Sequence, residues 1–396
     1  MDVSTRKIWW CCLLLGALVL TSGELRAQAP GVTDKEIAIG SCAALDGPSS
    51  FLGRETVAGA ETYFDLVNEE GGVNGRKLHL YSFDDSYDPA KVQGCWDKLM
   101  AQKIFALGFF VGTPTAMKYV PMAEAKEIPL VGLFTGAQGL YAPLRHWVIN
   151  VRASYFDETR EQVDGLWDTL HYRKIAVIYP DDAFGAAVLQ GVETALKTKS
   201  AQVAASASYA RQTSQVSEAI DKLRAANPEA VVVVGPSNTV APILKQSHAK
   251  GWKPLFVTVS FVGTDDLIQD AGADAEGTVI TQVVPPYYLT DLKTVAMYRR
   301  ALQKYMPVAR PNFVSLEGFV DAMVLVEGLK KAGKEPTREG LIQEIESMHN
   351  VDLGLGPELK LSYSAKSHKG FDHVIPTIVR GGKAVPFTDW SIVVQK

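Results

Sequence analysis

Short apolar segments alternate with amphipathic segments along most of the chain, and this alternation constrains the fold more than any other feature. Residues 35–41 form the first apolar segment, and a loop with glycine and proline leads to a helix expected over 53–68. The apolar residues of that helix recur at helical spacing: Val57, Ala60, Phe64 and Val67. Residues 230–234 are consecutive apolar residues, as expected of a strand buried on both faces. Strands that alternate with crossover helices form covered parallel sheets, so the sequence predicts an α/β protein.

The alternation begins again after residue 150, which predicts a second α/β unit. A helix expected over 157–170 and a strand over 174–179 open this second series, and another α/β stretch follows from residue 277. A chain of 396 residues is long enough for two or three hydrophobic cores. Because no low-complexity linker separates the units, we expect short, ordered connections between them.

The N-terminus has the order of a secretory signal peptide. Arg6 and Lys7 precede thirteen uncharged residues, 8–20, and small and polar residues then lead to Ala27 and Ala29. The apolar run is too short to cross a bilayer of about 30 Å as a helix. We therefore expect export, with cleavage after Ala29, which removes residues 1–29, or after Ala27 as an equally good site; the alternative is an uncleaved interfacial anchor.

Composition and motifs exclude several classes of function. Lys and Arg number 40 against 44 Asp and Glu, so there is no basic excess to neutralise a nucleic acid. The phosphate-binding, dinucleotide-binding, zinc-protease, paired-cysteine and serine-hydrolase motifs are all absent. His368 and His373 are the closest histidine pair and lack further ligands nearby. We therefore predict no enzymatic activity, no cofactor, no metal site and no nucleic-acid partner.

Two groups of residues leave alternatives open. The carboxylate pairs 84–85, 181–182 and 265–266 could serve acid–base chemistry, but each follows a strand and precedes a helix, where Asp commonly caps the helix. Cys42 and Cys95 could form a disulfide in an oxidising compartment, although their expected positions, at a strand end and in a helix, do not require one.

A series of short segments carries a resemblance to a known family. In chain order they are residues 47–53, 68–78, 84–85 with 88–89, 112–115, 128–129, 134–137, 152–155, 181–185 and 315–318. In this order, behind a signal peptide, they closely resemble the leucine/isoleucine/valine-binding-protein family, the periplasmic solute-binding components of ABC importers. The resemblance implies the type I periplasmic binding fold: two Rossmann-like α/β lobes with parallel sheets, joined by three hinge crossings, with a ligand cleft between them.

The same resemblance implies a division of the chain. The crossings are expected near 150–153, 282–285 and 362–370. The expected parts are residues 1–29 as signal peptide, 30–150 with 285–362 as lobe 1, and 151–284 with 363–396 as lobe 2.

The predicted ligand site follows from the position of loops in open α/β sheets. Ligands bind beyond the carboxyl ends of the strands, where helix N-termini offer free N–H groups to an anion. The residues expected in lobe 1 are Ser49, Phe51, Leu52, Gly112, Thr113, Phe134, Thr135 and Gly136. Those expected in lobe 2 are Tyr155, Phe184, Ser237, Ser260 and Phe261. The alternative for the phenylalanines is a place in the core, and for the threonines it is hydrogen bonding within loops.

One departure from the family bears on the ligand. Amino-acid-binding members place an acidic residue after a strand of lobe 2, and Ser260 stands at that position here. A buried ammonium without a partner costs several kcal/mol. The expected ligand therefore has a carboxylate and an aromatic or short apolar body but no α-ammonium. Asp265, Asp266 or Glu317 could supply the missing charge, in which case a branched-chain amino acid is the alternative ligand.

The expected function is that of a monomeric periplasmic binding protein, which passes a small molecule to the membrane permease of an ABC importer. A ligand-sensing domain of a signalling system is the alternative with the same architecture. An enzyme that uses the cleft is the third possibility, and it lacks a visible nucleophile–base pair.

Overall fold

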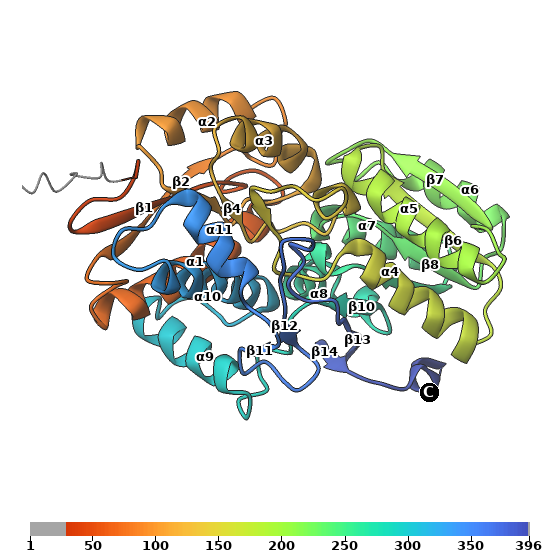
Figure 1. Cartoon of the computed structure of the whole chain (residues 1–396). Helices are drawn as coiled ribbons and strands as arrows, with labels where there is room; N and C mark the ends of the chain where they lie inside the picture. Colours follow the sequence, from red (N-terminus) through yellow and green to blue (C-terminus); the bar gives the residue numbers. More distant parts are fainter. Residues whose placement is uncertain (1–28, 395–396) are drawn as a thin grey trace, which may run out of the picture.

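A computed structural model describes residues 29–394, which form two α/β lobes (Figure 1). The predicted signal peptide, apart from Ala29, lies outside the described residues. Within residues 29–394 no helix is both long and apolar enough to cross a membrane.

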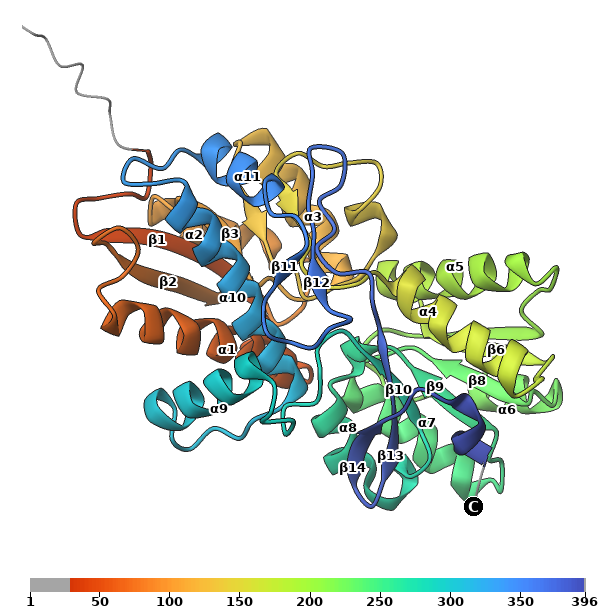
Figure 2. The same cartoon turned by 60° about the horizontal axis from the view of Figure 1, so that its bottom comes forward.

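The first lobe is built on a five-stranded parallel sheet. Its strand order is β2 (Lys77–Asp84), β1 (Glu36–Ala43), β3 (Ala106–Gly108), β4 (Leu130–Val131) and β5 (Val148–Ile149). The helices α2 (Val92–Ala101) and α3 (Thr113–Ala125) cover one face. The other face is covered by α1 (Ser50–Glu69), α10 (Phe313–Lys331) and α11 (Arg338–Glu346), and α9 (Lys293–Tyr305) packs against α1 and α10 (Figure 2). Both faces of the sheet are therefore buried, as parallel sheets require.

The second lobe is built on a seven-stranded mixed sheet. Its order is β14 (Lys383–Pro386), β13 (Ile375–Arg380), β10 (Val279–Gln282), β9 (Leu255–Thr258), β8 (Ala230–Val233), β6 (Ile175–Pro180) and β7 (Ala205–Tyr209). The strands from β10 to β7 are parallel, whereas β13 and β14 pair antiparallel at the edge. Its helices are α4 (Tyr155–Asp164), α5 (Ala183–Thr198), α6 (Ser217–Ala225), α7 (Ser237–Ala249) and α8 (Thr264–Ala271). Strand β8 is buried at every residue, as its apolar sequence predicts.

Short elements complete the description. Strands β11 (Val351–Asp352) and β12 (Lys360–Leu361) pair with each other. The short helical turns are η1 (Gln138–Leu140), η2 (Gly165–Thr169), η3 (Ser260–Val262), η4 (Gly272–Ala275) and η5 (Trp390–Val394).

The chain passes between the two sheets three times, after β5, after β10 and before β13. The first and third passages are hydrogen-bonded to each other, since Asn150 N–H donates to His368 O and Gly370 N–H donates to Asn150 O. The division into 30–150 with 285–362 and 151–284 with 363–396 is kept as our proposed domain division.

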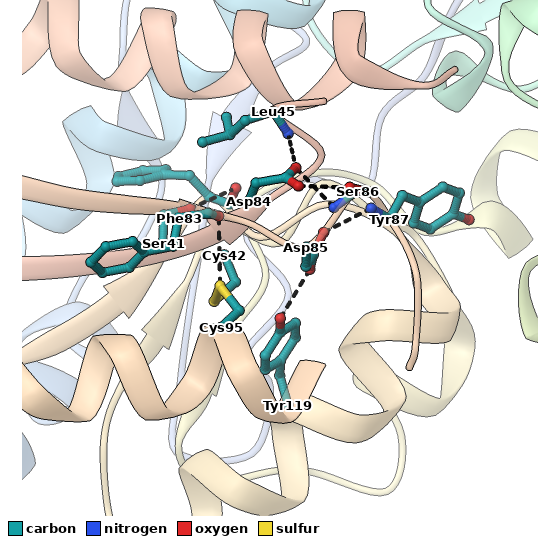
Figure 3. Close-up of a disulfide and its surroundings, with 11 residues drawn as sticks. Ser41, Cys42, Leu45, Phe83, Asp84, Asp85, Ser86, Tyr87, Cys95 and Tyr119 are labelled. Atoms are coloured by element: carbon teal, nitrogen blue, oxygen red, sulfur yellow. Dashed lines mark hydrogen bonds between the residues drawn. A yellow bond between two sulfur atoms is a disulfide. The ribbon is translucent and has the colours of Figure 1, made fainter. Parts of the chain in front are cut away.

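Cys42 of β1 and Cys95 of α2 form a disulfide, an alternative that the sequence leaves open (Figure 3). The bond ties α2 to β1, the second strand of the first sheet, and both cysteines are buried. It closes a loop between residues 53 positions apart.

The helix-cap interpretation of the paired aspartates is correct for Asp182. Its carboxylate accepts hydrogen bonds from Phe184 N–H and Gly185 N–H, at 2.9 and 3.0 Å, in the first turn of α5. Asp84 instead accepts the backbone N–H groups of Leu45 and Asp46, which fixes the loop that precedes α1.

Candidate functional site

Five aromatic side chains, from loops and from the first turns of helices in both lobes, meet between the two sheets. We call them the ring cluster: Tyr87, Phe134, Tyr155, Phe184 and Phe261. Phe261 is central, with its ring centroid 4.5 Å from that of Phe184, 5.6 Å from Phe134 and 5.7 Å from Tyr87. All five side chains are buried. Because rings of the first lobe touch Phe261 of the second, a molecule that inserts between them must separate the lobes.

Two glycines allow this packing. A Cβ atom at Gly112, whose φ is 93°, would lie 1.8 Å from the Tyr87 ring. A Cβ atom at Gly136 would lie 2.7 Å from Tyr155 N. The Gly112 N–H donates to Phe134 O at 3.1 Å, so in this structure it is engaged within the first lobe.

The predicted threonines lie beside the rings. The hydroxyl oxygens of Thr113 and Thr135 are 2.6 Å apart and buried, and the Thr135 hydroxyl also faces the Tyr155 phenol. In this structure the two hydroxyls therefore hydrogen-bond to each other, at the edge of the ring cluster that belongs to the first lobe.

The start of α1 faces the second lobe. The Ser49 hydroxyl donates to Asn238 Oδ1 at 3.5 Å, across the gap. The side chains of Phe51 and Leu52 approach Gly263, which follows Phe261 by two residues. These three predicted residues thus lie at the interface between the lobes.

The two predicted serines of the second lobe differ in their surroundings. Ser260 N–H donates to Glu158 Oε2 at 2.7 Å, and its hydroxyl donates to Glu158 Oε1 at 2.9 Å. The Ser237 hydroxyl instead donates to Asp270 Oδ2 of α8 at 2.5 Å. Ser260 is thus next to the ring cluster through Phe261, whereas the hydroxyl of Ser237 is directed to α8.

A buried ionic group lies against the rings, and of its residues the sequence analysis named only Glu317, as a possible source of negative charge for the ligand. Arg152 Nη2 is 3.1 Å from Glu158 Oε1, and Arg152 Nη1 is 3.2 Å from Glu317 Oε1. The guanidinium carbon lies 5.2 Å from the centroid of Phe134, and the side chain is 1% exposed. One signal was available in the sequence: Glu317 and Asp321 are one turn apart and are the only charged residues of 313–326, the buried part of α10, where charged residues are rare unless paired.

Burial controls the ionisation of this group. It raises the pKa of Glu317 to about 7 against the opposing charge of Arg152, and it raises the pKa of Asp321 well above its usual range. Burial disfavours the charge of Arg152, but Glu317 and Glu158 more than offset this and raise the Arg152 pKa. One permanent cation therefore faces three carboxyl groups, and burial disfavours the charged form of each.

Histidines and carboxylates elsewhere do not form a metal centre. Between residues 29 and 394, no three His, Cys, Asp or Glu side chains are grouped so as to hold a metal ion. His368 instead pairs with Glu346 at 2.8 Å.

Two kinds of comparison, with a family model and with the sequences of known proteins, find proteins similar to this chain. A family model described as "Periplasmic binding protein" matches residues 36–375. The Leu/Ile/Val-binding protein of Citrobacter freundii is 24% identical over 271 residues, which are 68% of this chain and 72% of that protein.

Solved structures share the whole fold. A possible leucine/isoleucine/valine-binding protein from Rhodopirellula baltica superposes with a TM-score of 0.87 at 29% identity, over 91% of this chain and 98% of that one. A branched-chain amino acid ABC transporter protein from Thermus thermophilus with bound valine gives 0.81 at 21% identity, over 90% and 97%. A solute-binding protein from R. palustris in complex with benzoate gives 0.78 at 18%, over 89% and 96%.

Proposed function

The chain belongs to the periplasmic binding protein family, and within that family we propose that it binds a small carboxylate whose body is aromatic or apolar. As an ABC transporter solute-binding protein, it binds its solute without chemical change, because the family is non-enzymatic. The identity of the solute is the part that we propose.

The ring cluster carries this proposal. Phe134, Phe184 and Phe261 offer aromatic faces from both lobes, and faces of this kind suit a flat or apolar body. The hydroxyls of Thr113 and Thr135 lie at one edge of these faces and can donate to a carboxylate. The apolar and the polar parts of the expected ligand thus each have a matching surface.

The surroundings of Ser260 support a ligand without an ammonium group. Glu158 is the carboxylate nearest to Ser260, but its Oε1 already contacts Arg152 and the Ser260 hydroxyl. Its Oε2 accepts from Ser260 N–H and from the Thr281 hydroxyl at 2.6 Å. Both oxygens are therefore engaged, and little capacity remains for a ligand ammonium.

Two of the other acidic residues considered from the sequence, Asp265 and Glu317, also have partners. Asp265 accepts a hydrogen bond from the Tyr287 hydroxyl at 2.7 Å and another from Phe313 N–H at 3.2 Å. Glu317 pairs with Arg152. Of the two related structures with named ligands, the benzoate complex is thus the better guide than the valine complex.

The location and partner belong to the same proposal. A signal peptide over residues 1–29 would direct the chain to the periplasm, where the disulfide between Cys42 and Cys95 is stable. There the protein, as a monomer, would deliver its ligand to the membrane permease of the importer.

Isothermal titration calorimetry tests the ligand class. Benzoate, phenylacetate and hexanoate are compared with leucine and valine, and we expect heat only from the acids without an ammonium group. Phe261→Ala should abolish that heat, because Phe261 joins the rings of both lobes. Phe83→Ala, in the edge strand β2, is the control and should bind as the unaltered protein does. Submicromolar binding of leucine with no response to the acids would show that the proposed class is wrong.

A further inference from the structure

We propose that Arg152 binds the carboxylate of the ligand and that Glu317 takes up a proton from solvent as the ligand binds. This inference rests on the proposed function, because it requires an anionic ligand group next to the ring cluster. It assigns roles in ligand binding to two further residues, and it couples ligand binding to the uptake of one proton.

The hydrogen-bond donors of Arg152 are only partly used. A guanidinium has five N–H donors. Within the described residues, Nη2 contacts Glu158 and the Ser260 hydroxyl, whereas Nε and Nη1 make no hydrogen bond although both atoms are buried. Nη1 approaches Glu317 Oε1 at 3.2 Å as an ion pair without hydrogen-bond alignment. Two donor atoms therefore remain for another acceptor, and a carboxylate is the acceptor that a guanidinium binds best.

The position of Arg152 fits that role. Its guanidinium carbon lies 5.2 Å from the centroid of Phe134 and 5.7 Å from that of Tyr155. Phe134 contacts Phe261, and Thr135 follows it in the chain. A carboxylate attached to a body held by the rings can therefore reach the donors of Arg152 and the Thr135 hydroxyl together.

Glu317 is the less firmly held of the two carboxylates on Arg152. Glu158 accepts hydrogen bonds from Arg152, Thr281 and both the N–H and the hydroxyl of Ser260. Glu317 Oε1 has no hydrogen bond although it is buried, and Asp321 Oδ2 is in the same condition. A buried carboxylate without hydrogen bonds is costly as an anion, so Glu317 is the group that gains most from a proton when another anion approaches Arg152.

The charged and titratable groups around Glu317 come from several segments. Arg152 and Glu158 act on it from the first crossing and α4, and Asp321 lies one turn along α10. The Tyr141 phenol, which follows η1, also acts on it. On the helices packed against α10, Glu55 of α1 and Tyr298 of α9 approach Ser315. Arg152 is the cation of this group, so the way it is shared between its partners decides the charge of Glu317.

The sign of the proton exchange follows from this arrangement. With a pKa of about 7, Glu317 is mostly protonated at pH 6 and mostly ionised at pH 8 in the free protein. A ligand carboxylate on Arg152 adds a negative charge nearby and raises the pKa of Glu317 further. Binding should therefore take up almost no proton at pH 6 and close to one at pH 8, with the affinity falling up to about tenfold per pH unit above pH 7.

The experiment is titration calorimetry with benzoate as the probe, at pH 6 and pH 8, in phosphate and in Tris buffer. The two buffers differ in ionisation heat, so the difference in binding heat gives the number of protons taken up. We expect about one proton at pH 8 and none at pH 6. No uptake at pH 8 would overturn the proposal.

Variants of Glu317 distinguish proton uptake on ligand binding from a purely structural role of this residue. Glu317→Gln should take up no proton and should bind benzoate at pH 8 about tenfold more tightly than the unaltered protein, because no anion competes for Arg152. A structural role alone predicts weaker binding instead. Glu327→Gln is the matched control on the same helix, where Glu327 pairs with Lys330 at the surface, and it should retain the uptake. Unchanged uptake in Glu317→Gln would reject the role of Glu317.

The outcomes also distinguish this inference from the proposed function. If leucine binds and the acids do not, the ligand class is wrong, and the same buffer comparison with leucine supports or rejects the role of Glu317. If no member of the panel binds, both proposals are rejected.

Discussion

The guanidinium carbon of Arg211 lies 4.0 Å from the centroid of the Tyr87 ring, and the two residues belong to different lobes. Arg211 also donates through Nη2 to the backbone carbonyl of Tyr87, and its Nε pairs with Asp182 at 3.2 Å. One side chain thus connects the loop after β7 and the cap of α5 to the ring cluster. Such a contact can form only when the lobes are closed, because it spans the gap between them.

We therefore expect Arg211→Ala to favour the open form. Loss of the cation–π contact and the hydrogen bond should weaken ligand binding about tenfold, while the melting temperature of the ligand-free protein changes little. Calorimetry and small-angle scattering measure the affinity and the lobe separation. Arg173→Ala is the control, since Arg173 lies 4.3 Å from the Trp167 ring within the second lobe. Equal effects of the two substitutions would show that Arg211 does not hold the lobes together.

Asp85 should make the folded protein less stable as the pH rises. Burial raises its pKa to about 6, although its carboxylate accepts hydrogen bonds from Tyr87 N–H and the Tyr119 hydroxyl (Figure 3). A carboxyl whose pKa is higher in the folded than in the unfolded chain stabilises the fold below about pH 4, and this contribution is lost as the pH rises to about 6.

Asp85→Asn should remove that dependence, because the amide carries no charge: its oxygen can still accept from Tyr87 N–H, and its NH2 group can donate to the Tyr119 hydroxyl oxygen. We expect the variant to be more stable than the unaltered protein above pH 6, by about 1–3 kcal/mol, and to show a flatter profile between pH 4 and pH 6. Urea unfolding followed by circular dichroism measures both. Asp97→Asn, at the exposed face of α2, should leave the profile unchanged.

The disulfide should contribute strongly to the stability of the first lobe. A cross-link between residues 53 positions apart lowers the entropy of the unfolded chain, and the loop-closure relation gives about 4 kcal/mol. We expect the double substitution Cys42→Ala and Cys95→Ala to lower the melting temperature by about 5–10 °C in calorimetry. Added reductant should not lower the melting temperature of the double variant any further. If reductant lowers the melting temperature of the double variant by the same amount, the loss of stability has a cause other than the disulfide.

The two lobes were predictable because local sequence decides them. Buried strands such as β8 are apolar throughout, and Asp182 caps the N-terminus of α5, as its residue type predicts. The ring cluster was partly predictable for the same reason, since each of its phenylalanines follows the carboxyl end of a parallel strand: Phe134 follows β4 of the first sheet, and Phe184 and Phe261 follow β6 and β9 of the second.

The ionic group behind the rings was not predictable from local pattern. Arg152 and Glu317 are 165 positions apart in sequence, and only the path of the chain through the crossings brings them together. The direction in which a side chain points from a helix was also not predictable from the local sequence. Ser237 begins α7 as expected, but its hydroxyl is directed to Asp270. Tyr87 was missed because its loop depends on two consecutive residues with positive φ, at Ser86 and Tyr87.

A substitution at Gly112 tests whether ligand binding depends on the position of the Tyr87 ring. A Cβ atom at this position would lie 1.8 Å from the ring and would also require a side chain at a φ of 93°, so Gly112→Ala must displace Tyr87 or the loop. Since Tyr87 contacts both Phe261 and Arg211, we expect at least a tenfold loss of ligand affinity and a destabilisation of about 1–3 kcal/mol. Gly139→Ala is the matched control, because a Cβ atom there meets nothing within 4 Å. If Gly112→Ala lowers stability but leaves benzoate affinity intact, Tyr87 supports the fold of the first lobe without taking part in the closed site.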